Sequence, residues 1–168
     1  MSRATLEHLF SCFDTTYQVL GASAPNLTDD AYVVRTYEAA RAMGDVALSL
    51  RTILLDAPRT PVEALRDVLV ESVADDLSGA MLLFCLAMVV GPRLMVSLRD
   101  AREFEEFDAD ALSVLNEASA VVLAEILAIG AVAKSQGTID DEHWQEQARG
   151  LARHLEEAGY ADSFGISH

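Results

Sequence analysis

One stretch limits what this chain can fold into: the fourteen residues from Leu77 to Val90 carry no charge, and only Ser78 is clearly polar. A segment that is apolar on every side is either a helix wrapped by other helices or a membrane insert. Gly91 and Pro92 end the run well short of the roughly 20 apolar residues that a bilayer crossing needs. The stretch therefore predicts the central helix of a folded core, and a membrane protein is not expected.

The remaining sequence predicts amphipathic helices around this core. Apolar residues recur at helical spacing over about 3–20, 29–56, 61–90, 93–104, 109–136 and 140–158. The central helix is expected to run without a break from about 61 to 90, through Gly79. Thr60, Pro61 and Glu63 have the pattern of a capping box at its start. We predict an all-α, single-domain bundle of five or six helices over residues 1–168, with a short tail from about 160.

Composition restricts the partners. The chain has 27 acidic and 12 basic residues, for a net charge of −15, and this field repels nucleic acid phosphates. Nucleic-acid binding is therefore not expected. A hydrophobic content of 51% excludes a disordered chain. The acidity either complements a basic partner protein or serves only as a solubilising surface, and charge alone does not decide between them.

The cysteines and the N-terminus both predict a cytoplasmic protein. Cys12 and Cys85 lie among apolar residues, and two thiols make no disulfide framework, so both are expected to be reduced and buried. The first ten residues contain Glu7 inside a short apolar stretch, which is not the pattern of a signal peptide.

Two carboxylates are the candidate catalytic residues. Asp76 falls on the expected inward side of the central helix, and Glu125 lies among valines and alanines. A buried carboxylate has either a raised pKa, as in many active sites, or an arginine partner. The alternative for both is therefore an ion pair with an arginine or a position at the rim of the core.

The sequence predicts no metal site and no cofactor. His143 and His154 are eleven residues apart, about 16 Å along a helix, which is too far for one metal ion. No phosphate-binding loop, dinucleotide fingerprint or Gly-x-Ser-x-Gly motif is present.

Two short patterns resemble known helical families. The spacing from Arg149 to His154 is similar to the Arg-x4-His motif of HEPN ribonucleases, which implies that these residues handle a scissile phosphate; Gly150 replaces the usual polar residue. A central apolar helix entered through Asp76-Leu77-Ser78-Gly79 resembles the apoptosis-regulator family, which implies a groove for a partner's helix. There Ser78 stands in place of a tryptophan, and Ala80 in place of an arginine.

The segment 103–110 is the candidate partner-binding surface. It holds five acids in eight residues together with two aromatic side chains, and acids beside aromatics suit a basic, partly apolar partner. The residues expected to make contact are Glu103, Phe104, Glu105, Glu106, Phe107 and Asp108.

These observations favour a non-catalytic acidic protein–protein interaction module: an inhibitor, adaptor, chaperone or assembly component. Its partner is expected to be a protein that is basic or presents an amphipathic helix, and a homo-oligomer is also possible. The alternative is an enzyme of unrecognised type that uses Asp76 or Glu125.

Overall fold

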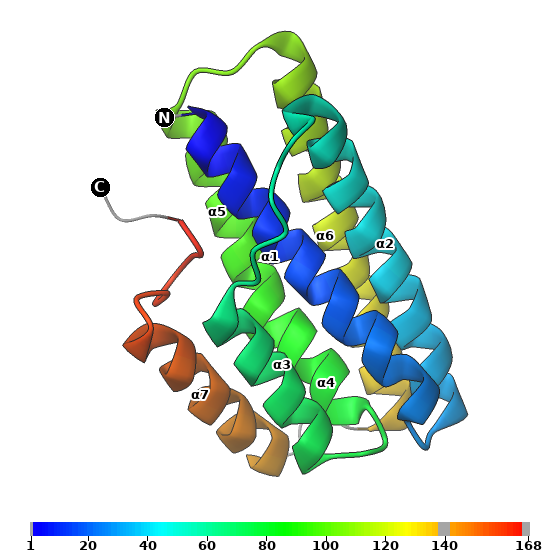
Figure 1. Cartoon of the computed structure of the whole chain (residues 1–168). Helices are drawn as coiled ribbons and strands as arrows, with labels where there is room; N and C mark the ends of the chain where they lie inside the picture. The colour runs from blue at the N-terminus through cyan, green and yellow to red at the C-terminus, as the bar shows by residue number, and fades with distance from the viewer. Residues whose placement is uncertain (1, 138–141, 166–168) are drawn as a thin grey trace.

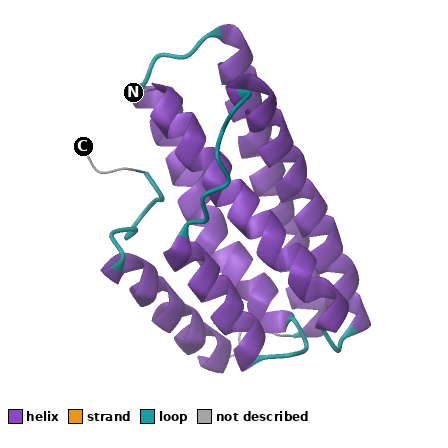
Figure 2. Ribbon diagram, viewed as in Figure 1, coloured by secondary structure: helices purple, strands orange, loops and turns teal. Residues whose placement is uncertain are grey.

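The computed structural model describes residues 2–137 and 142–165, and this part of the chain contains helices and no strands (Figures 1 and 2). The predicted all-α bundle around an apolar central segment is confirmed. The elements are α1 (Ser2–Ser23), the short 3-10 turn η1 (Ala24–Asn26), α2 (Asp30–Leu54), α3 (Glu63–Asp75), α4 (Ala80–Cys85), the π-helical turn η2 (Leu86–Val90), α5 (Gly91–Phe104), α6 (Ala109–Gln136) and α7 (Glu142–Glu157). Asp140, where the last helix was expected to begin, lies outside the described residues.

The central segment extends past the predicted stop at Gly91 and Pro92. α4, η2 and α5 follow one another as a single helical run of 25 residues, Ala80–Phe104. Proline has no amide hydrogen, and its ring clashes with the carbonyl four residues earlier in an α-helix. The π-turn relieves this conflict, since the Gly91 amide bonds to the Leu86 carbonyl five residues back. The prediction that Gly91-Pro92 ends the helix was wrong because this wider turn accommodates proline.

The predicted continuity from 61 to 90 through Gly79 was also wrong. The backbone leaves the helical conformation at Asp76, and Gly79 has φ of +98°, a value that residues with a Cβ rarely adopt. A Cβ at Gly79 would also lie 2.8 Å from the Leu27 side chain. Apolar spacing persists across this break because both α3 and α4 bury a face in the same core.

The expected capping box at Thr60 and Glu63 does not form. α3 begins at Glu63, and the residue before it, Val62, supplies no side-chain cap. The Val62 amide instead donates to the hydroxyl of Thr15 in α1, at 3.1 Å. A hydroxyl 47 positions away in the sequence thus takes the role that local pattern assigned to Thr60.

Within the described residues, two helices are long and apolar enough to cross a membrane, but the bundle covers them unequally. The segment Ala80–Phe104 has 78% of its apolar window buried, as expected of a core helix. α6 packs against α2 and α5 and has 28% of its window buried. In Figure 1, α6 lies behind α1, alongside α2, while α7 lies against α3 on the other side of the bundle.

The segment expected to be a tail is attached to the core through Phe164. Phe164 is fully buried, and its amide donates to the Ser97 hydroxyl at 2.8 Å. The guanidinium of Arg93 donates to the carbonyls of Tyr160 and Ala161. These bonds attach the end of the described chain to α5.

Both cysteines are free and buried, as predicted. Burial raises the pKa of Cys85 to about 12, and it raises that of Cys12 as well. The two thiols are therefore protonated at neutral pH and have little nucleophilic character.

Gly91 should be irreplaceable at the π-turn. A Cβ there would lie 2.8 Å from both the Ile126 side chain and the Leu86 carbonyl oxygen. Gly91→Ala should therefore lower the free energy of unfolding by about 1–3 kcal/mol. The matched control is Gly150→Ala in α7, where a Cβ meets nothing within 4 Å and should stabilise the helix by up to about 1 kcal/mol. Denaturant titration measures both, and equal effects at the two glycines would contradict the packing described.

Candidate functional site

Asp76 is a structural cap. Its carboxylate accepts hydrogen bonds from the Ser78 amide at 3.0 Å, the Ser78 hydroxyl at 2.8 Å and the Met81 amide at 3.1 Å. The carboxylate thereby satisfies a backbone donor in the first turn of α4. The expected inward position on a continuous helix is not formed, because the helix is interrupted at this residue.

Glu125 is held in an ion pair with Arg35 of α2, with the nearest atoms 2.5 Å apart. The two side chains are 15% and 13% exposed, and Arg35 also contacts Glu38 at 2.8 Å. Burial raises the pKa of Glu125, while Arg35 acts in the opposite direction through its charge and hydrogen bond. Desolvation is the larger effect, so the pair joins α2 to α6 at an electrostatic cost. Of the possibilities considered for Glu125, the structure shows the ion pair with an arginine, and the arginine is Arg35.

The acidic run 103–108 divides into an exposed part and a structural part. Glu103, Phe104 and Glu106 are exposed. Phe107 packs against the core, and Asp108 caps α6 by accepting from the Ala111 amide at 2.8 Å. One oxygen of Glu105 is buried and has no hydrogen-bond partner. The structure therefore leaves Glu103, Phe104 and Glu106 exposed.

The residues of the HEPN-like spacing both lie on α7. Arg149 is exposed on α7, while the Nδ1 atom of His154 lies 3.7 Å from the Glu71 carboxylate of α3. Among the described residues, no group of three or more histidines, cysteines and carboxylates could hold a metal ion.

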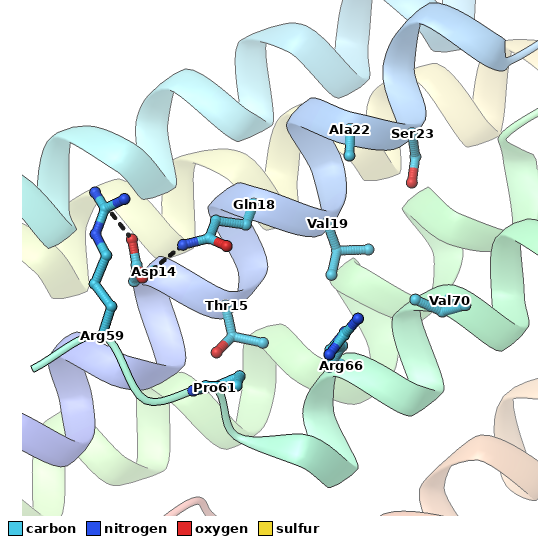
Figure 3. A pocket seen from close by; sticks show the side chains of 10 residues that line it. All are labelled: Asp14, Thr15, Gln18, Val19, Ala22, Ser23, Arg59, Pro61, Arg66 and Val70. Carbon is cyan, nitrogen blue, oxygen red and sulfur yellow. Dashed lines mark hydrogen bonds and ion pairs between the residues drawn. The ribbon is translucent and has the colours of Figure 1, made fainter.

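Two hollows lie beside α1. One hollow of about 610 Å³ lies between α1 and α3, and a second of about 560 Å³ lies between α1 and α2. Asp14 and Arg59 line both, so the two form one surface that we call the α1 groove. Figure 3 shows the first hollow, with Asp14 and Gln18 on α1 near Arg59 and with Arg66 on α3.

A buried carboxylate marks the centre of the α1 groove. The Asp14 side chain accepts from the Gln18 amide at 2.9 Å and lies 3.7 Å from the Arg59 guanidinium. Gln18 and Arg59 thus fix Asp14, and the Arg59 side chain remains half exposed above it.

Aromatic and cationic side chains line the second hollow. Tyr17 lies against Gly44 of α2, where a Cβ would come within 2.8 Å of its ring. Tyr37, Arg41, Leu48 and Arg51 are exposed along α2 on the same side. Arg41, Arg51 and Arg66 make no ion pair with the described part of the chain.

Sequence inspection did not identify this groove. Tyr17 and Tyr37 occupy positions that fit the apolar stripes of their helices, and yet both are about half exposed. One signal was available: Tyr37, Arg41, Gly44, Leu48 and Arg51 recur at alternating spacings of four and three, which places them on one side of a helix. Whether other helices would cover that side could not be inferred from the sequence, because it depends on how the helices pack.

Comparison with known proteins adds no relative: no protein-family model, curated protein or solved structure matches this chain.

The cost of burying Glu125 should become visible when Arg35 is removed. Arg35→Leu removes both effects that lower the pKa of Glu125, so the folded-state pKa should rise further above the unfolded value. A raised folded-state pKa means that stability is lost as pH rises through it, so the variant should lose about 3–5 kcal/mol at pH 7 and recover much of this at acidic pH. Denaturant titrations over a pH series measure the effect. Adding Glu125→Gln to this variant should abolish the recovery of stability at acidic pH. If the recovery persists, a titratable group other than Glu125 causes it.

Proposed function

We propose that this chain is a non-catalytic protein–protein interaction module that binds an acidic, partly apolar segment of a partner protein in the α1 groove. The single observation that carries the proposal is that three arginines of the groove, Arg41, Arg51 and Arg66, form no ion pair within the described residues. Four of the 12 basic residues line it, against two of the 27 acids.

The imbalance supports an acidic ligand. On a chain of net charge −15, arginines have many carboxylates available as partners. Arg41, Arg51 and Arg66 nevertheless have none in the described part of the chain and stay exposed beside the hollows. Arginine binds carboxylates in a two-pronged geometry, so such side chains are suited to acidic groups from outside. The proposal therefore replaces the basic partner that overall charge predicts with an acidic one at this groove.

The remaining lining supports a protein segment as the ligand. Tyrosine and arginine are enriched at the energetic centres of protein interfaces, because they combine apolar area with hydrogen-bonding groups. Tyr17, Tyr37 and Leu48 provide the apolar area here. Each hollow has a volume that suits several side chains of a bound segment, and the two share Asp14 and Arg59 in their lining.

A second surface, around Phe104, still suits the basic partner that the sequence predicts. Phe104 is largely exposed, and so are Glu103 beside it and Glu106 two residues further along the chain. This surface is smaller than first expected, because Phe107 and Asp108 are used by the fold.

We further propose a reducing compartment such as the cytoplasm as the site of action. Free, buried cysteines support this assignment.

The groove is tested by reversing its charge. Three proteins are each used to capture partners from the native source: the wild type, the groove variant Arg41→Glu/Arg51→Glu and the α7 control Arg149→Glu/Arg153→Glu. The captured proteins are quantified by mass spectrometry. Both double variants change the net charge equally. We expect an acidic protein that the wild type and the α7 control retain and the groove variant loses by at least about tenfold, since it replaces two attractions with repulsions. If both variants lose the acidic protein equally, overall charge explains the effect. If both retain it equally, the α1 groove is not the binding site.

A further inference from the structure

α6 has an apolar side that the fold leaves uncovered. The helix is apolar enough to cross a membrane, yet only 28% of its apolar window is buried. Leu123 and Leu127 both point outward, and Leu127 is 65% exposed. A helix that is apolar on all sides is ordinarily covered on all sides. An exposed apolar surface of this kind indicates contact with another molecule.

Six exposed residues of α6 form a regular line. Glu117, Ala120, Ala124, Leu127, Ala131 and Lys134 are all exposed and recur at alternating spacings of three and four. This is the spacing of the contact positions in paired helices. The line has one acid at its start, four apolar residues in the middle and the chain's single lysine at its end.

We propose that this line is the interface of a homodimer, in which α6 of a second copy packs antiparallel against it. A two-fold axis crossing the helix between positions 125 and 126 brings every member of the line opposite another member. Glu117 then faces Lys134 of the second copy, Ala120 faces Ala131, and Ala124 faces Leu127. The same contacts repeat on the other side of the axis, as two-fold symmetry requires.

Charge complementarity selects a second copy as the occupant. Glu117 lines a small hollow together with Asp45 of α2, and neither forms an ion pair in the described part of the chain. Lys134 also forms no ion pair with any described residue. Antiparallel pairing supplies each copy's two acids with the lysine of the other. Two copies of charge −15 repel elsewhere, so an uncharged surface ending in opposite charges is where they can approach.

The middle of the line suits close packing. The one charged residue between Glu117 and Lys134 is Glu125, which is turned toward Arg35 and away from the line. Alanine side chains let two helix axes approach to about 8 Å, the lower end of the usual range. Leu127 can then insert between residues of the facing helix as a knob.

The oligomeric state tests the proposal first. We expect sedimentation equilibrium of the wild type to show a dimer with a Kd below about 100 µM. Leu127→Lys should weaken it at least about a hundredfold, because it buries an unpaired charge in the contact. The control is Leu48→Lys on α2, an equally exposed leucine on the α1 groove, which should leave the dimer intact. The proposal would be overturned if the wild type stays monomeric, or if Leu127→Lys and Leu48→Lys weaken the dimer equally.

The antiparallel register is tested by exchanging the end charges. Glu117→Lys alone places lysines opposite each other, and Lys134→Glu alone places acids opposite each other, so each variant should dimerise about tenfold or more weakly. Mixing the two variants restores both opposite-charge contacts and should restore the dimer. In a parallel pair each position faces its own counterpart, so wild type already has like charges opposite each other and neither single variant would weaken the dimer; unweakened single variants would overturn this register. Wild type that binds neutral vesicles as a monomer would instead identify a lipid surface as the occupant.

Discussion

The π-helical turn at Leu86–Val90 keeps the central segment of the bundle continuous, and the other helices depend on that continuity. An ordinary α-helix would kink or end at Pro92. The bond from the Gly91 amide to the Leu86 carbonyl lets the segment continue to Phe104. α6 and α7 both pack against η2, and α6 also contacts α4 and α5 on either side of it. A break at the proline would divide the surface on which these two helices rest.

The sequence predicted what depends on local composition and period. An uncharged run between amphipathic segments was sufficient to predict the fold class, because such a run must be covered by other helices. The boundaries were less predictable. The break at Asp76 depends on a carboxylate that bonds to backbone two and five residues ahead, and the start of α3 depends on Thr15 in another helix. Helical period cannot reveal either, since apolar spacing continues across the break.

The site was less predictable than the fold because it depends on which helix sides remain uncovered. Glu125 was correctly recognised as a carboxylate in apolar surroundings, but its partner Arg35 is 90 positions away in the sequence. Tyr17 and Tyr37 have apolar rings that fit an inward stripe, and the packing leaves both at the rim of the α1 groove. In the acidic run, pattern suggested one surface, whereas the fold uses Phe107 and Asp108 for packing and capping.

The two proposed surfaces meet at Asp45, and this position connects their electrostatics. Asp45 lines the α1 groove beside Arg41, and it also lines the small hollow with Glu117 next to α6. Its negative charge opposes the binding of an acidic ligand, since the Debye length at physiological salt is about 8 Å. In the antiparallel dimer, Lys134 of the second copy lies at this end of α6 and offsets the charges of Asp45 and Glu117. Dimerisation would thereby make each groove more favourable to acidic groups. The dimer also carries two grooves, so a partner with repeated acidic segments would bind it more tightly than a single groove permits.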